Sequence, residues 1–128
     1  MLPSAVQAEL ASADAPEPVR TWIAAPPGWL EILAAPLSSD LAGIHRGEAA
    51  AIALASSMSA DLVLMDDRRG VAAARRQGLR VTGTLGVLDL AAQRGLVDFQ
   101  VAIAALGRTT FRRPDELMNA LLIKHKGE

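Results

Sequence analysis

The chain has 128 residues, of which 51% are hydrophobic, and this is enough for one domain with one core. The absence of cysteine excludes disulfides and thiolate metal sites, and the net charge of −1 argues against a simple basic surface for nucleic acid. The sequence shows neither a signal peptide nor an apolar run of bilayer length, so we expect a soluble, cytoplasmic protein with no membrane partner.

Charge is distributed unevenly along the chain. Residues 1–67 hold two Arg against nine Asp or Glu, a net charge of −7. Residues 68–128 hold eleven Lys or Arg against five Asp or Glu, a net charge of +6. Such asymmetry indicates either an acidic cluster that faces a basic rim or a chance distribution over solvated surfaces.

Prolines divide the first third of the chain into short elements. A helix is predicted from Pro3 to about Ser12, with the proline in its first turn. A second short helix is predicted from Glu17 to about Ala25. The alternating pattern of Trp29–Leu33 predicts a strand.

The middle of the chain alternates between helices and short apolar strands. His45–Ser57 is rich in alanine and apolar on nearly every face, which predicts a buried helix. The apolar run Asp61–Met65 predicts a buried parallel strand. A basic helix is predicted for Arg68–Gln77, and a further strand for Leu79–Thr82.

Three more helices are predicted in the last third, at Leu85–Gln93, Asp98–Leu106 and Pro114–Lys124. The alternation of helices and strands predicts an α/β protein with a short parallel sheet. Three strands are few for such a sheet, so we expect an N-terminal strand to be absent.

Four acidic or hydroxyl positions are candidates for a metal site, and each has a plainer structural interpretation. Asp66 and Asp67 follow an apolar strand, where ligand sites of parallel sheets gather, yet either could cap the next helix. Glu48 lies in the first turn of its helix, where it could interact with the helix N-terminus instead of a metal. Thr84 lies between two glycines and could touch a metal-bound water or cap a helix.

Basic residues follow the acidic pair directly. They could contact phosphates or form a solvated helix face, and they comprise Arg68, Arg69, Arg75, Arg76 and Arg80. Aromatic residues make up only 3% of the chain, so base stacking on single strands is not expected. His45 and His125 have no neighbouring Ser or Cys that would suggest a catalytic triad.

Three strings in order resemble a family of short bacterial PIN-like proteins: RGEAAAIALA (Arg46–Ala55), DLVLMDDRRG (Asp61–Gly70) and LRVTGTLGVL (Leu79–Leu88). The N-terminal LPSAVQAEL (Leu2–Leu10) and the helical tail from Gly95 to Leu121 extend the resemblance to practically the whole chain. The resemblance implies a single PIN-like domain over residues 1–128, with three layers in the order α/β/α.

The resemblance also implies a site. PIN domains gather three or four acids around Mg²⁺ or Mn²⁺, and the matching positions here are Glu9, Glu48 and Asp67 as catalytic metal ligands. Asp66 is implied as a further ligand and Thr84 as a supporting residue. We expect Arg68 and Arg69 to contact RNA phosphates.

The chain departs from the family pattern at several positions. The opening strand and helix, with the aspartate that the family carries there, have no counterpart, so we expect an N-terminally truncated domain. The family acid before the GEA motif is His45, and its second glutamate is Ala50.

Two hypotheses follow from the resemblance. The first is a Mg²⁺- or Mn²⁺-dependent endoribonuclease, the toxin of a toxin–antitoxin pair, with RNA, an antitoxin protein and a second copy of itself as partners. The second is a catalytically incomplete PIN remnant that serves as a binding or dimerisation module.

Overall fold

The computed structural model describes residues 1–36, 43–111 and 115–126 of the chain. The chain folds into two compact units, an N-terminal unit of residues 1–81 and a C-terminal unit of residues 82–128. Within the described ranges no helix has both the length and the apolar character needed to cross a bilayer.

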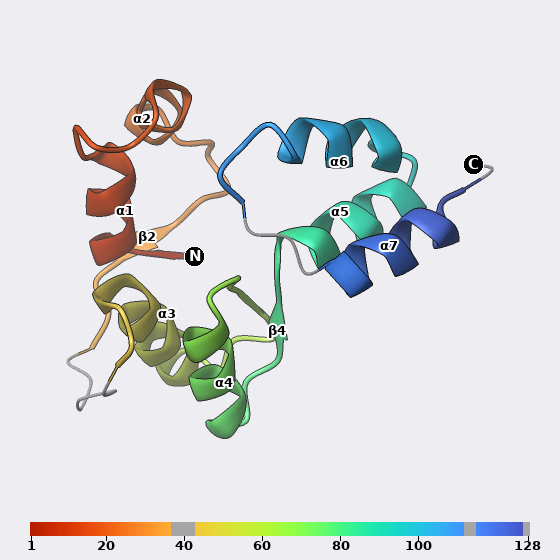
Figure 1. Ribbon diagram of the computed structural model, residues 1–128. Coiled ribbons are helices and arrows are strands. Elements are labelled where there is room, and N and C mark those ends of the chain that lie inside the picture. Colours follow the sequence, from red (N-terminus) through yellow and green to blue (C-terminus); the bar gives the residue numbers. More distant parts are fainter. Residues whose placement is uncertain (37–42, 112–114, 127–128) are drawn as a thin grey trace. The chain divides into compact units, whose positions relative to one another are not determined.

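The N-terminal unit alternates between strands of two residues and helices of eight to twelve (Figure 1). Its elements in chain order are β1 (Leu2–Pro3), α1 (Ser4–Ala11), α2 (Glu17–Ala24), β2 (Ile32–Leu33), α3 (Arg46–Ser57), β3 (Val63–Leu64), α4 (Arg68–Arg76) and β4 (Val81–Thr82), the last of which reaches the boundary between the units.

The described strands form two separate two-stranded sheets, β1 with β2 and β3 with β4. β1 and β2 run parallel, with Leu2 opposite Ile32 and Pro3 opposite Leu33. The small α/β fold with parallel pairing confirms the expectation from the sequence. The residue pattern alone did not predict strand β1, which is too short to show an alternation.

The core of the N-terminal unit lies between α3, β3 and α4. Small side chains dominate it, which allows these elements to pack closely. Its buried members are Ile52, Ala55, Val63, Met65, Ala73 and Ala74.

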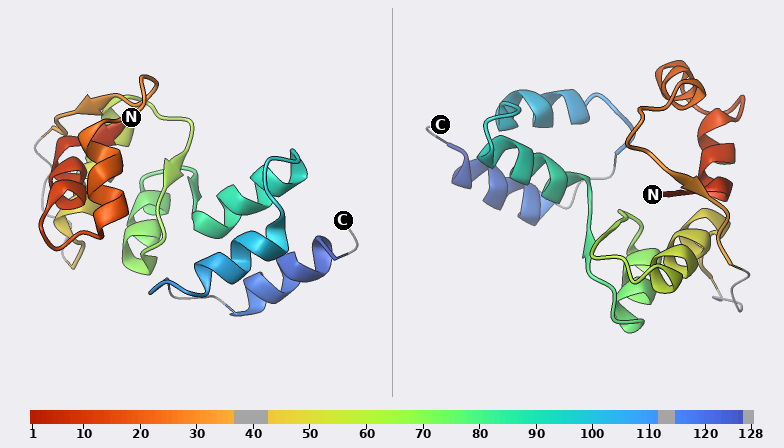
Figure 2. Two further views of the ribbon diagram at one scale, coloured as in Figure 1. Left: turned by 90° about the horizontal axis from the view of Figure 1, so that it is seen from above. Right: turned by 180° about the vertical axis from the view of Figure 1, so that it is seen from behind.

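The C-terminal unit consists of the helices α5 (Thr84–Gln93), α6 (Phe99–Leu106) and α7 (Asp115–Lys124). Figure 2 shows these helices from two further directions. They surround a second apolar cluster, with Leu85, Ala92, Phe99, Ile103 and Met118 as its buried members. Pro114, the predicted first residue of the last helix, lies outside the described residues.

Helix boundaries follow local capping chemistry. The Asp98 carboxylate accepts a hydrogen bond from the Val101 amide at 3.0 Å and so caps the N-terminus of α6. Gly78 and Gly95 follow two helices with φ of +79° and +71°, a conformation that favours glycine. The predicted cap at Thr84 is wrong, because Gly83 occupies the N-cap and Thr84 is the first helical residue.

A buried histidine joins two helices of the C-terminal unit. His125 is 2% exposed, stacks on the Phe99 ring at 4.4 Å and lies 2.7 Å from an Asp89 carboxylate oxygen through Nε2. Lys124 donates to the same carboxylate at 3.0 Å. The hydrogen bond with His125 lowers the pKa of Asp89 from 3.8 to about 2, and the contact with Lys124 adds to the effect while burial opposes it.

Asp89→Asn is therefore expected to destabilise the C-terminal unit by about 2 kcal/mol at pH 7. The stabilisation is fully present above the unfolded-state pKa of 3.8 and disappears as the pH falls through about 2, so the difference between the two proteins should be smaller at pH 3 than at pH 7. Urea denaturation followed by circular dichroism at pH 7 and pH 3 measures this, with the exposed Glu116→Gln as the control. Equal stability of wild type and Asp89→Asn at pH 7 would contradict the assignment.

Candidate functional site

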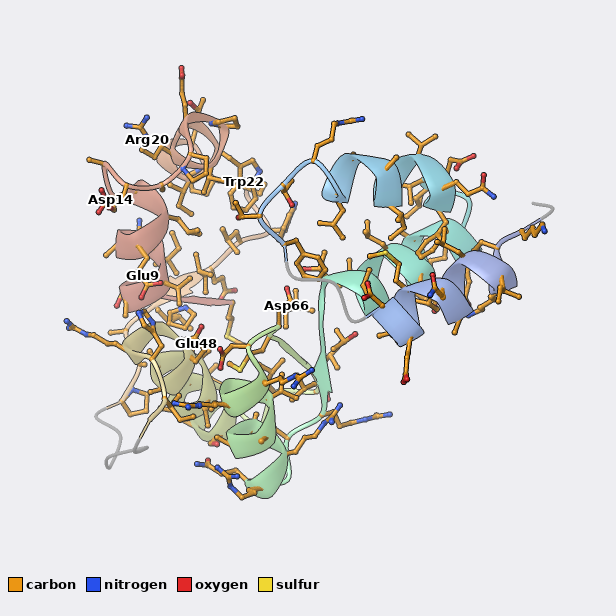
Figure 3. The ribbon with its side chains drawn as sticks, in the orientation of Figure 1. Glu9, Asp14, Arg20, Trp22, Glu48 and Asp66 are labelled. Atoms are coloured by element: carbon orange, nitrogen blue, oxygen red, sulfur yellow. The ribbon has the colours of Figure 1, made fainter. Side chains whose placement is uncertain are left out.

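Two glutamates meet where α1 contacts α3. Glu9 lies on α1 and Glu48 lies in the first turn of α3, and Figure 3 labels both. The Glu9 carboxylate rests against Gly47, where an added Cβ would stand only 2.8 Å from its Oε1 atom. The missing side chain at position 47 therefore makes room for Glu9 beside the start of α3.

His45 stands between these two carboxylates. Its Nδ1 atom lies 3.6 Å from Glu9 Oε1 and 3.1 Å from Glu48 Oε2. The same nitrogen accepts a hydrogen bond from the Gly47 backbone N–H at 3.3 Å, as the N-cap of α3. Nδ1 in this role carries no proton that it could donate to either glutamate.

The Glu48 Oε2 atom is consequently a buried acceptor without a hydrogen-bond partner. A buried carboxylate oxygen that loses its water and gains no donor is unfavourable. Here it faces a ring nitrogen that is itself an acceptor, and the Glu9 carboxylate lies near the same nitrogen. The three acceptor groups are the carboxylates of Glu9 and Glu48 and the Nδ1 atom of His45. A cation or a proton between them would interact favourably with all three.

A second glycine brings α4 against the same glutamate. A Cβ at Gly70 would stand 2.6 Å from Met65 Sδ and 3.1 Å from Glu48 Cγ. The Gly70 amide donates to Asp67 Oδ1 at 2.9 Å, so Asp67 caps α4. Of the two acids that could cap this helix, Asp67 is therefore the one that does so.

An open cleft lies beside Glu9 and His45. It has a volume of about 660 Å³, and its lining includes Glu9, Asp14, His45 and Arg46. The guanidinium of Arg69 lies 3.7 Å from the position of a Cβ at Gly43, just before α3. Arg46 and Arg69 thus place positive charge at the border of the acidic site.

The remaining predicted site residues lie in two different parts of the chain. Asp66, Asp67 and Arg68 are exposed at the turn between β3 and α4. Thr84 belongs to the C-terminal unit, at the half-buried start of α5. Across the described ranges, no three His, Asp or Glu side chains stand close enough to hold a metal ion together as placed.

Four residues at this site escaped the prediction from sequence: His45, Arg46, Gly47 and Gly70. A signal for the glycines was present, because a glycine inside a helix costs about 1 kcal/mol relative to alanine and needs a packing reason. His45 directly precedes the acidic motif, yet only the folded chain places its ring beside Glu9.

Gly70→Ala and Gly47→Ala should have opposite effects on stability. The new Cβ at position 70 meets buried Met65 and the stem of Glu48, so we expect a net loss on the order of 1 kcal/mol after the gain in helix propensity. The new Cβ at position 47 meets only the end of the Glu9 side chain, which is 47% exposed and can swing away.

Gly47→Ala should consequently keep or raise the stability, by up to about 1 kcal/mol. Thermal denaturation of both variants measures the difference, with Gly28→Ala as a control because a Cβ there meets nothing within 4 Å. A Gly70→Ala protein at least as stable as Gly47→Ala would show that α3 and α4 are not packed as described.

Comparison with known proteins identifies the family. A family model described as a PIN domain (DUF3368) matches residues 1–127. No curated protein and no solved structure shows a significant match to the chain. PIN domains are of nuclease type and generally depend on divalent metals. On the strength of a match over nearly its whole length, the chain belongs to the PIN domain family.

Proposed function

We propose that this PIN domain hydrolyses RNA phosphodiester bonds with a divalent cation held by Glu9 and Glu48. One observation carries the proposal, the buried Glu48 Oε2 atom without a hydrogen-bond partner. It faces an acceptor nitrogen of His45 at 3.1 Å, so the position next to it favours a positively charged occupant.

The residues present fit Mg²⁺ or Mn²⁺. Mg²⁺ keeps several waters and is usually held by one or two carboxylates together with substrate phosphates, so a set of three protein ligands is not required. Glu9 and Glu48 supply two carboxylates, and the family resemblance adds Asp67, one oxygen of which caps α4. When bound, such a cation activates a water and stabilises the charge on the scissile phosphate.

The remaining residues bind and orient the substrate. Arg46 lines the cleft beside Glu9, and Arg69 reaches the segment before α3, so both are positioned to pair with phosphate oxygens. Arg68 extends the positive charge along the first turn of α4. A cation at a helix N-terminus is unfavourable on its own, and a bound phosphate there would offset that cost.

The finer parts of the proposal come from the family resemblance. They are RNA as the substrate, Mg²⁺ or Mn²⁺ as the metal, and the role of a cytoplasmic toxin that pairs with an antitoxin and with a second copy. The resemblance likewise implies two further residue roles and the domain organisation. Asp66 would be a further metal ligand, Thr84 would be a supporting residue, and residues 1–128 would form a single domain.

Glu48→Gln should reduce cleavage of single-stranded RNA in Mn²⁺ at least about a hundredfold, because it removes the buried charge that attracts the metal. Chelation with EDTA should abolish cleavage by the wild type. Gel analysis of labelled RNA measures the rate, and calorimetric titration with Mn²⁺ measures whether the metal affinity falls in parallel.

The matched control is Glu31→Gln, which removes an exposed carboxylate elsewhere in the N-terminal unit and should leave both measurements unchanged. Equal cleavage by wild type and Glu48→Gln would refute the assigned site. Tight Mn²⁺ binding without any RNA cleavage would refute the nuclease function and retain the metal site.

A further inference from the structure

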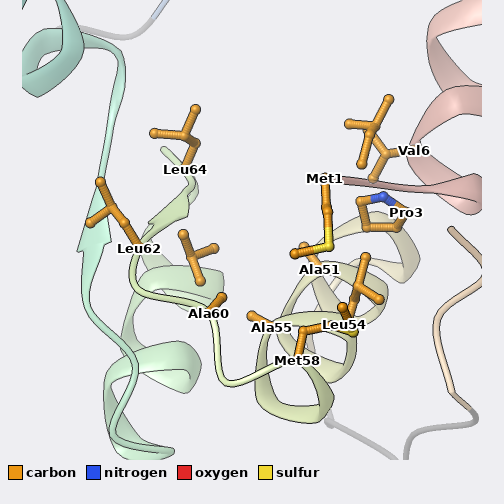
Figure 4. Close-up of a pocket in the computed structure, with 12 residues that line it drawn as sticks. Met1, Pro3, Val6, Ala51, Leu54, Ala55, Met58, Ala60, Leu62 and Leu64 are labelled. Carbon is orange, nitrogen blue, oxygen red and sulfur yellow. The ribbon is translucent and has the colours of Figure 1, made fainter. Parts of the chain in front are cut away.

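The first turn of α3 differs in chemistry from the rest of the helix. Ala51, Leu54 and Ala55, further along α3, line an apolar slot of about 340 Å³ that Figure 4 shows in close-up. No residue that lines this slot carries a charged side chain, so a divalent cation would lose its hydration there without compensation. The groups that attract a cation lie instead at the start of the helix, where His45 and Glu48 are in contact.

The ring of His45 lies at the distances expected of a metal ligand. Its Nδ1 atom is 3.1 Å from Glu48 Oε2 and 3.6 Å from Glu9 Oε1. Two atoms that share one metal ion, each about 2.1 Å from it, stand about 3.0 Å apart in octahedral geometry and about 3.4 Å apart in tetrahedral geometry. Both separations from Nδ1 are therefore close to those between ligands of a single ion.

The two more exposed side chains have room to complete such a site. As placed, no three His, Asp or Glu side chains in the described ranges hold a metal ion together. The Glu48 side chain is the most enclosed of the three at 29% exposed, whereas Glu9 is 47% exposed and His45 is 66% exposed. Glu9 and His45 can therefore rotate toward Glu48 Oε2 while the helices that carry them stay in place.

Helix capping alone does not account for an imidazole at this position. His45 is the N-cap of α3, and its Nδ1 atom accepts a hydrogen bond from the Gly47 amide at 3.3 Å, longer than a typical bond of about 2.9 Å. Asn, Asp, Ser and Thr are the preferred N-cap residues. Histidine is thus a weak cap, but it brings an acceptor nitrogen within reach of two carboxylates. Coordination replaces the bond from Gly47, because a neutral imidazole has one acceptor nitrogen.

We propose that His45 is a nitrogen ligand of the cation and makes the site selective for first-row transition-metal ions over Mg²⁺. The inference rests on the proposed function, which assigns a cation to Glu9 and Glu48 and gives His45 no role toward it. Mg²⁺ favours oxygen ligands and keeps several waters, whereas imidazole suits transition metals. The affinity of a site with one imidazole and two carboxylates rises from Mn²⁺ through Co²⁺ to Ni²⁺.

Pulsed electron paramagnetic resonance of the full chain loaded with Mn²⁺ tests the ligand directly. A histidine nitrogen bonded to Mn²⁺ produces a nitrogen coupling in the electron spin echo, and this signal does not depend on catalytic activity. The chain has two histidines, so two variants assign the signal. We expect the coupling in the wild type and in His125→Gln, whose changed residue lies in the C-terminal unit, and its loss in His45→Asn.

His45→Asn removes the imidazole and keeps a good cap for α3, so the variant should fold, and circular dichroism checks this. Calorimetric titration at pH 8 compares the metals, because protons compete with a metal for its ligands. We expect the wild type to bind Mn²⁺ and Co²⁺ at least about tenfold more tightly than Mg²⁺. His45→Asn should weaken Mn²⁺ and Co²⁺ at least about tenfold and change the Mg²⁺ affinity less than about threefold.

His45→Asp provides the converse comparison. It replaces the nitrogen ligand by a third carboxylate and also keeps a preferred N-cap. We expect its Mg²⁺ affinity to rise above that of the wild type and its preference for Co²⁺ over Mg²⁺ to fall. An unchanged preference would contradict the role of His45 in metal selection.

The outcomes separate this inference from the proposed function. Mn²⁺ bound by the wild type without nitrogen coupling, and with the metal preference of His45→Asn, would overturn the role of His45 and leave the cation at Glu9 and Glu48. No Mn²⁺ binding by the wild type would overturn both. A nitrogen coupling that is lost in His45→Asn, in a protein that cleaves no RNA, would support the ligand and refute the nuclease function alone.

Discussion

The close approach of α3 and α4 at Gly70 is the constraint on which the acidic site depends. A side chain at position 70 would collide with Met65 and with the stem of Glu48, so only glycine allows the two helices to pack at this distance. This close approach brings the first turn of α4 against the stem of Glu48, and one oxygen of the same carboxylate is buried. Packing and site chemistry therefore meet at the same side chain.

The acceptor groups at this point favour a positively charged occupant. Glu48 Oε2 is buried without a donor, and the neighbouring His45 Nδ1, 3.1 Å away, already accepts a bond from Gly47. Such an arrangement costs free energy in the free protein and returns it when a positive species binds. Functional sites commonly store unfavourable contacts of this type, whereas a purely structural cluster would have acquired a donor.

Much of the fold was predictable because helices in this chain carry strong local signals. Gly78, Gly95 and Asp98 end or begin helices through conformational and capping preferences that depend on neighbouring residues alone. The residue pattern did not show strand β1, because two residues have no periodicity and the pairing with β2 depends on a segment thirty residues away. The role of His45 was missed for a related reason, since its contact with Glu9 joins two distant helices. Asp67 was expected as a metal ligand, and the structure shows it capping α4. Its carboxylate accepts a hydrogen bond from the amide of Gly70, three residues further along the chain.

The central claim is that Glu9 and Glu48 hold a divalent cation beside His45. A crystal of the full chain grown with Mn²⁺, with anomalous diffraction collected near the manganese edge, tests it most directly. We expect an anomalous peak in contact with the Glu48 carboxylate, on the side that faces Glu9 and His45. A map without a peak there, in which Glu48 Oε2 instead accepts a hydrogen bond from a protonated His45, would contradict it.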